Sequence, residues 1–267
     1  MSETHPRWGG PGEDYRLKKI RTTEAELFGP DDPAPAQAPT WRIPQRVRSL
    51  PFLEIIFTIL GTIGVIVLMV TYVRTGGVVS AAVMTSLALI PLVIVLGVLS
   101  YLDRWEREGW KSNFICFIWG AGVATLSSLV VNSTVNLDLA RTLGDQDSAA
   151  VIVAVFVAPV AEEFFKGIGV IIFILARRTS INSRLDGLIC GGIVGAGFAF
   201  IENIQYFLRT SSSGAFMLTT TVFTRGILSP FVHPMATSFT GMAIALVLIR
   251  RYGALWSTIR VFLGYLT

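Results

Sequence analysis

The chain has 267 residues, of which 52% are hydrophobic and only 15% are charged. A soluble domain normally carries about 25% charged residues, so the composition excludes an ordinary soluble protein and indicates an integral membrane protein. The formal net charge of +4 comes from Lys and Arg beside apolar stretches. That placement is typical of a topology signal and not of a nucleic-acid-binding surface, so we expect no nucleic-acid partner.

The N-terminal residues 1–48 are rich in Pro, Gly and charge. Such a segment buries too little apolar area to offset the entropy cost of ordering. We therefore predict a disordered tail over 1–48, followed by a transmembrane domain over 49–267.

Long apolar stretches begin at Pro51. A transmembrane helix needs about 20 predominantly apolar residues, so the sequence predicts an all-α, polytopic transmembrane helix bundle. A seventh span begins near Ala254 and is cut off at Thr267, and we expect the membrane domain to continue beyond it. The six full spans are expected at 51–73, 79–102, 113–135, 150–176, 185–208 and 231–249.

Basic residues gather in the loops on one side of these spans. The opposite loops carry only Arg74, Arg141 and Arg209. The positive-inside rule then places the N-terminus and the tail in the cytoplasm, and we expect a multi-pass protein of the plasma membrane. The basic residues on the cytoplasmic side are Arg42, Arg46, Arg48, Arg104, Arg107, Lys111, Arg177, Arg178, Arg184, Arg250 and Arg251.

Residues 214–228 do not fit this scheme, because they are too few and too polar to cross a membrane. They include Thr219, Thr224 and Arg225 among apolar neighbours. We expect an amphipathic helix on the outer interface or a re-entrant segment.

The fourth span carries Glu162, Glu163 and Lys166 within five residues. Charged groups inside a membrane cost at least a few kcal/mol each and usually serve a function. Lys166 follows Glu163 by three residues and Glu162 by four, so it can pair with either. The unpaired carboxylate is expected to be a metal ligand or a general base. The alternative is a structural ion pair, which leaves the second glutamate unexplained.

The fifth span carries a third carboxylate, Glu202, followed by Asn203. Upstream, Gly187, Gly191 and Gly195 form two overlapping GxxxG steps, which let another helix approach closely. We expect this stripe to pack the helix of Glu202 tightly against a neighbour. The amide of Asn203 could then orient a substrate carbonyl or a water.

The sixth span begins with His233, and Thr237 lies one turn further on the same face. A lone histidine at a membrane edge is ordinarily an interfacial polar residue, but the acidic groups elsewhere in the bundle favour a site. His233 and Glu202 fall near the outer end of their spans, whereas Glu162 falls nearer the middle. The three therefore meet only if span four tilts, kinks at Pro159 or starts late.

These side chains predict hydrolytic chemistry in the outer half of the membrane. Glu163, Glu202 and His233 form a candidate ligand set for Zn²⁺, which accepts carboxylate oxygen and imidazole nitrogen. No HExxH motif is present, which excludes an ordinary zincin. The set also works without metal if one glutamate activates a water while His233 and Asn203 stabilise the oxyanion.

The three elements resemble the PrsW family of intramembrane proteases. The family pattern is matched by Glu162-Glu163-x-x-Lys166, by Phe198-x-x-x-Glu202-Asn203 and by His233, all within residues 150–245. The resemblance implies a membrane-embedded endopeptidase, whose best-known relative cuts an anti-sigma factor at site one. It implies a single-pass membrane-protein substrate of that kind, cut near the extracytoplasmic face.

The same resemblance implies distant kinship with the CAAX prenyl endopeptidases, and by that analogy it assigns roles. Glu162 activates the water, and Glu163 is a supporting carboxylate paired with Lys166. Glu202 stands where those relatives carry a histidine, and His233 with Thr237 stands where they carry His-x-x-x-Asn. The predicted catalytic group is Glu162, Glu163, Lys166, Glu202, Asn203 and His233.

Two other functions fit intramembrane Glu, Lys and His. One is a proton-coupled transporter, although the two halves of the chain show no inverted repeat. The other is a catalytically inert scaffold that binds transmembrane helices through the glycine-rich surface. Cleavage that depends on Glu162 separates the protease from both.

Overall fold

The computed structural model describes residues 51–104, 109–178 and 181–250. Helices dominate these residues and no strand occurs among them, so the all-α class is confirmed. The predicted tail over 1–48 and the predicted seventh span near Ala254 lie outside the described residues.

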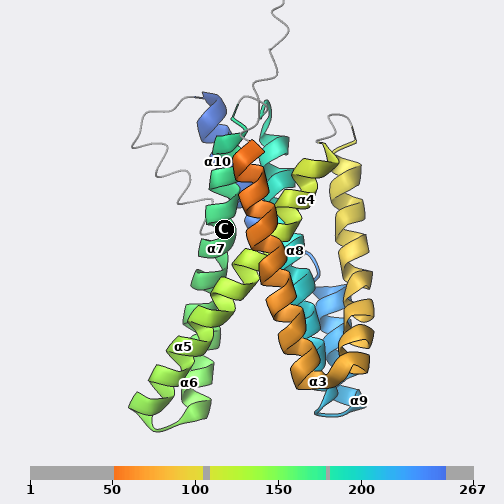
Figure 1. Cartoon of the computed structure of the whole chain (residues 1–267), viewed down its shortest axis with the longest axis vertical. Helices are drawn as coiled ribbons and strands as arrows, with labels where there is room; N and C mark the ends of the chain where they lie inside the picture. The colour runs from red at the N-terminus through yellow and green to blue at the C-terminus, as the bar shows by residue number, and fades with distance from the viewer. Residues whose placement is uncertain (1–50, 105–108, 179–180, 251–267) are drawn as a thin grey trace, which may run out of the picture. The chain divides into compact units, whose positions relative to one another are not determined.

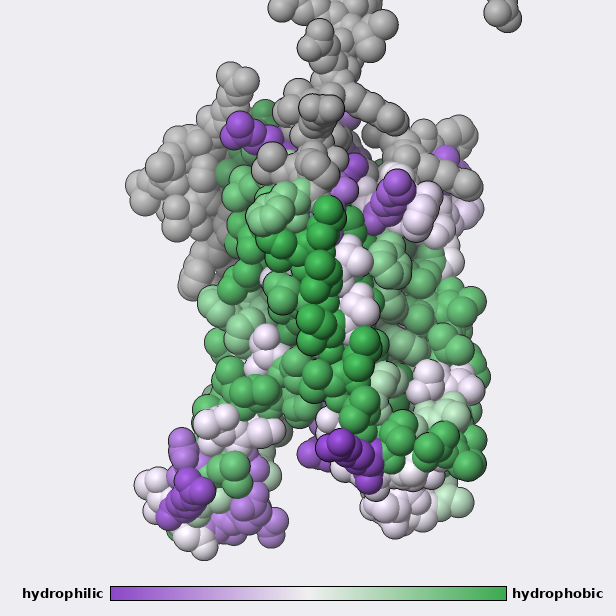
Figure 2. All heavy atoms as spheres, viewed as in Figure 1, coloured by the Kyte–Doolittle hydropathy of each residue, from purple (hydrophilic) through white to green (hydrophobic). Residues whose placement is uncertain are grey.

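Five helices in the described part are long and apolar enough to cross a membrane, which supports a multi-pass membrane protein. Figure 2 agrees, because apolar residues cover the middle of the visible face and polar residues lie toward its two ends. The prediction of six or seven spans is not confirmed by this count. The five helices are Phe52–Leu102, Trp110–Leu143, Gln146–Ala176, Arg184–Ser211 and Ala215–Ile249.

The first of these helices, α3 (Pro51–Leu102), has a break in its middle. Its 52 residues would measure about 78 Å as one straight rod, more than twice the ~30 Å of a bilayer core. At Gly77 the backbone has φ 79° and ψ 160°, a conformation open to glycine without steric cost. The chain reverses there, and Figure 1 shows the two arms running in opposite directions.

The next two rods form a hairpin. The first consists of α4 (Trp110–Ile118), the π-helical turn η1 (Trp119–Ala124) and α5 (Thr125–Leu143), and the second of α6 (Gln146–Ile152), η2 (Val153–Val157) and α7 (Ala158–Ala176).

The turn of this hairpin is held by local hydrogen bonds. Gly144 closes α5 in the left-handed conformation, and Asp145 then caps α6 by accepting from the backbone N–H groups of Asp147 and Ser148. Hydrogen bonds from the side chain of Ser148 and from these two N–H groups hold the pKa of Asp145 below its ordinary value.

The central element is α8 (Arg184–Ser211), which begins with a capping box between Ser183 and Asp186. The most apolar stretch of 18 residues in this helix is 89% buried inside the fold, far more than the corresponding stretch of any other candidate span in the described residues. The chain continues through α9 (Ala215–Phe223), η3 (Thr224–Leu228) and α10 (Val232–Arg250). The segment over 214–228 is therefore helical, and its place at the bilayer surface stays a prediction.

The glycine stripe of α8 packs against α10. A Cβ atom built on Gly191 would lie 2.1 Å from the carbonyl oxygen of Thr237, and one on Gly195 would lie 2.6 Å from that of His233. The predicted close helix approach is thus confirmed. Because the two backbones touch, His233 at the start of α10 is brought to the side of α8 that carries Glu202.

Candidate active site

Three of the predicted residues, each from a different helix, lie together. Glu162 comes from α7, Glu202 from α8 and His233 from α10, and one ligand-type atom of each lies within 4.8 Å of the others. All three line one cavity of about 530 Å³. The spans therefore place these side chains at one level of the bundle.

The apparent mismatch in depth is resolved by the length and tilt of the helix that carries Glu162. The rod α6–η2–α7 starts at Gln146, so Glu162 lies about 24 Å along it at helical rise. Figure 1 shows this rod leaning away from α8 toward the end where it joins α5. A long, inclined helix therefore brings Glu162 level with Glu202.

Lys166 distinguishes the two adjacent glutamates. Its side chain is fully buried, and its ammonium forms an ion pair with Glu163, as the family resemblance implied. The same nitrogen lies 3.1 Å from Nδ1 of His233 and 4.3 Å from the ring centroid of Phe198. Glu162 has no such partner among the described residues, since His233 Nδ1 is 4.0 Å from its nearer oxygen.

The contacts of His233 determine which ring nitrogen carries a proton. An ammonium group only donates hydrogen bonds, so Nδ1 of His233 accepts from Lys166. The other nitrogen, Nε2, lies 2.9 Å from Oε2 of Glu202, which only accepts when ionised. His233 is thus held as the neutral tautomer with its proton on Nε2, between a cation and a carboxylate.

Arg225 also contacts the cluster, although its sequence context predicts no such role. Its guanidinium pairs with Glu202, donates from Nε to Oδ1 of Asn203 at 2.9 Å, and stacks 3.9 Å from the ring centroid of Tyr206. A lone arginine among the threonine and apolar residues of 214–228 was the available signal. It pointed to no partner, because nothing local links that segment to α8.

Asn203 and Thr237 support the site without facing its cavity. Asn203 is buried, its amide oxygen is taken by Arg225, and it is not among the residues that line the cavity. Thr237 is fully buried, and its hydroxyl donates to the carbonyl oxygen of His233 at 3.0 Å.

Two of the π-helical turns adjoin these residues. The turn η2 (Val153–Val157) comes directly before Pro159 and Glu162, and η3 contains Arg225. Such turns shift the register of a helix by part of a turn and are frequent at functional sites. They adjust the direction in which the following side chains point.

The donor atoms of the cluster fit a divalent cation. Three carboxylates, Glu162, Glu163 and Glu202, face two cations, Lys166 and Arg225, which leaves one formal negative charge when His233 is neutral. Two carboxylates and one imidazole are ligand types that zinc accepts. The set that lies close together contains Glu162 in place of the predicted Glu163, because Lys166 engages Glu163.

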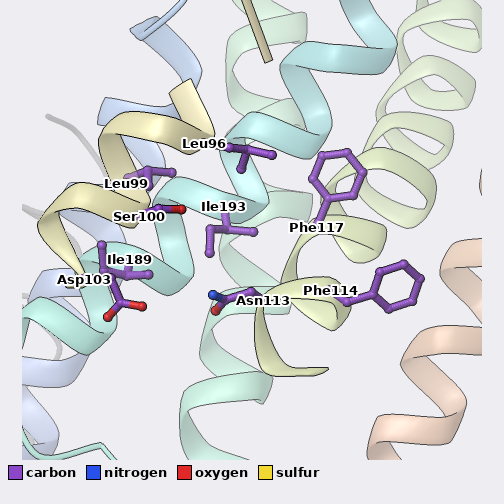
Figure 3. A pocket seen from close by; sticks show the side chains of 9 residues that line it. All are labelled: Leu96, Leu99, Ser100, Asp103, Asn113, Phe114, Phe117, Ile189 and Ile193. Carbon is purple, nitrogen blue, oxygen red and sulfur yellow. The ribbon is translucent and has the colours of Figure 1, made fainter. Parts of the chain in front are cut away.

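A second cavity, of about 330 Å³, lies elsewhere in the bundle between the end of α3, the start of α4 and α8. Figure 3 shows that Asp103 and Asn113 border it together with aliphatic and aromatic side chains. Asp103 is the one ionisable residue in its lining, and the lining has no histidine. The cavity of Glu162 is therefore the better candidate for hydrolytic chemistry.

A sequence model of the PrsW family intramembrane metalloproteases matches residues 108–267, a range that includes every residue of the cluster. No curated protein and no solved structure matches the chain. The matched range covers more than half of the chain and contains the Glu162, Glu202 and His233 cavity. The chain therefore belongs to the PrsW family of intramembrane metalloproteases and is a membrane-embedded hydrolase.

Proposed function

We propose that this protein cuts a peptide bond of a single-pass membrane protein and that Glu162 takes the proton of the attacking water. One observation carries the proposal: of the three carboxylates in the cluster, Glu162 alone has no paired cation while it lines the cavity. An ionised carboxylate without a partner is the group best able to accept a proton.

The proposed reaction is the hydrolysis of an amide bond by water. The water oxygen attacks the carbonyl carbon of the substrate while one water proton moves to the carboxylate of Glu162. The protonated Glu162 then gives that proton to the amide nitrogen as the C–N bond breaks, which leaves a carboxylic acid and an amine. Lys166 and Glu202 hold the ring of His233 in one orientation beside these events.

Glu202 and His233 are the residues that would hold the metal, and Glu162, the third member of the close group, would lie beside it as the base. When bound, a divalent ion such as Zn²⁺ would acidify a bound water and polarise the substrate carbonyl. A neutral imidazole binds a metal through the nitrogen that carries no proton, so binding at Nε2 of His233 would require its proton to move to Nδ1 and would replace the hydrogen bonds to Glu202 and from Lys166.

The topology that we propose places this chemistry near the extracytoplasmic face of the plasma membrane. The two arms of α3 on either side of Gly77 count as two crossings, which makes six in the described residues. With the N-terminus in the cytoplasm, the α5–α6 turn and the C-terminal end of α8 lie outside. A membrane-anchored regulator of the anti-sigma-factor kind is the proposed substrate.

The change Glu162→Gln tests the general base, because it keeps the shape of the side chain and removes the proton acceptor. We expect cleavage to fall by about 10²- to 10⁴-fold. Membranes from cells with wild-type protein or Glu162→Gln are compared by mass spectrometry of new N-termini, and the trapped substrate is then assayed with purified protein. Glu54→Gln, remote from the cavity, is the matched control and should cleave at the wild-type rate.

The same assay separates the alternatives. Equal cleavage by wild type and Glu162→Gln, with matching thermal unfolding, would overturn the role of Glu162. A complete lack of new N-termini, together with Glu162-dependent proton uptake in liposomes, would favour a transporter.

Metal content gives an independent prediction. Purified wild-type protein should hold about one zinc ion per chain, and the variant His233→Ala should lose it while Glu54→Gln keeps it. Elemental analysis measures the metal, and dialysis against a chelator should remove activity that added Zn²⁺ restores. Full activity in a metal-free sample would refute the metal but leave the role of Glu162 intact.

A further inference from the structure

The cavity of the cluster extends well beyond the three residues that could bind a metal. Its lining includes Asn132 and Asn136 on α5 and Gln205 and Arg209 on α8. Both helices run toward the same end of the bundle in Figure 1, and Figure 2 shows the visible surface hollowed between the α5–α6 turn and α3 at that end.

The wall formed by α5 is a polar stripe on an otherwise membrane-type helix. Thr125, Ser128, Asn132 and Asn136 follow one another at intervals of three or four residues, which puts them on one helix face. The hydroxyls of Thr125 and Ser128 donate to carbonyl oxygens of their own rod. These two side chains are therefore satisfied without a ligand.

The two asparagines are not satisfied in this way. The Oδ1 atoms of Asn132 and Asn136 are shielded from solvent, and within the described residues neither accepts a hydrogen bond. Buried amide oxygens without a donor are unfavourable and are uncommon in folded proteins. Two of them, side by side on the wall of a cavity that ends at hydrolytic residues, indicate a ligand that supplies N–H donors.

The spacing of the pair matches an extended peptide. Asn132 and Asn136 are four residues apart, about 6.0 Å along the helix axis. An extended strand directs N–H groups to the same side every second residue, about 6.7 Å apart. The geometry points to a binding track on α5 in which Asn132 and Asn136 accept hydrogen bonds from alternate backbone N–H groups of an unwound substrate segment that leads to Glu162.

The α8 residues of the lining can satisfy the carbonyl groups of the same strand. Gln205 and Arg209 are also four residues apart, and their amide and guanidinium groups can donate to backbone carbonyls. In an intact helix the backbone groups are already paired, and in lipid an unwound segment needs other partners for them. This inference rests on the proposed function, because a protease must unwind the substrate helix to reach a peptide bond.

Binding is measured without cleavage, in the full-length Glu162→Gln variant in nanodiscs. The probes are three dye-labelled peptides of Leu and Ala: an uninterrupted helix, the same peptide with a central Gly-Gly-Pro break, and the broken peptide N-methylated beside the break. We expect the broken peptide to bind about tenfold more tightly than either other peptide. Adding Asn132→Leu and Asn136→Leu should remove this preference.

The controls separate a binding role from a structural one. Thr134→Val, on the exposed face of α5, should keep the tenfold preference. The two Asn→Leu changes remove buried polar atoms without donors, so the thermal unfolding midpoint should not fall. N-methylation should weaken binding in the parent and have no further effect in the Leu variant, as in a double-mutant cycle.

Equal binding of all three peptides to the parent, or an unchanged preference in the Leu variant, would overturn the track. Failure of the proposed function is a different result. If the protein prefers the broken peptide but wild type releases no product, the binding track is supported and the protease function is refuted. If cleavage is unchanged by the Leu substitutions, the protease function is supported and the binding track is refuted.

Discussion

Lys166 is a fully buried cation whose three contacts come from three different helices. It pairs with Glu163 on its own helix, touches Nδ1 of His233 on α10 and lies over the ring of Phe198 on α8. These contacts leave the neighbouring Glu162 without a paired cation. The buried ammonium therefore fixes the positions of Glu163 and of the imidazole beside the carboxylate that we propose as the base.

Removing this cation should destabilise the protein. Lys166→Met leaves the Glu163 carboxylate unpaired, and breaking a buried ion pair in this way costs about 3 kcal/mol. The double variant Lys166→Met with Glu163→Gln should recover part of that loss, because no isolated charge remains. Unfolding in a denaturant series measures the free energies, with exposed Lys111→Met as the matched control. A Lys166→Met variant as stable as wild type would contradict the prediction.

At the scale of elements, the contact between α8 and α10 brings His233 to Glu202. The space between the two helices admits no side chain at Gly187, Gly191 or Gly195, because an added Cβ would meet backbone atoms of α10. Backbone cannot move aside as a flexible side chain can. The glycine stripe therefore sets how closely α10, with His233, approaches α8.

The change Gly191→Ala tests this contact. Its Cβ would lie 2.1 Å from the Thr237 carbonyl oxygen, so α10 must shift, at a cost of about 1–3 kcal/mol. We expect a lower unfolding midpoint and a loss of cleavage together, because His233 moves with α10. The matched control is Gly97→Ala, where an added Cβ meets nothing within 4 Å and the better helix propensity of Ala costs no stability. Equal behaviour of the two variants would refute the packing argument.

The contribution of the segment from α9 to η3 shows what sequence patterns miss. We expected an amphipathic interfacial helix or a re-entrant segment over 214–228; the segment is helical, and it carries Arg225 to Glu202 and Asn203. That contact depends on the reversal at Gly214, where φ is 106°. Nothing in the local composition determines the direction in which a chain continues after such a turn.

At the scale of the bundle, most polar groups of the site lie on or against the most buried helix. The helix α8 supplies Glu202 and Asn203, receives α10 through its glycines, and forms one wall of the cavity. The predicted spans at 51–73 and 79–102 correspond to the two arms of α3, which the break at Gly77 separates. A buried central helix is the natural place for ionisable groups that lipid would not tolerate.

The sequence by itself determined the membrane class, the helical fold, the glycine surface and the residues of the candidate site other than Arg225. These features follow from local quantities: the apolar length of a span, residue spacing on a helix, and the free-energy cost of a charge in lipid. Only the tertiary structure decided that Lys166 forms its ion pair with Glu163, since both glutamates lie within its reach along the helix. The further contacts of the ammonium with His233 and Phe198 favour the position beside Glu163. The tertiary structure also decided the common depth of Glu162 and Glu202, because helix tilt is set by packing against other helices and not by the residues of the helix itself.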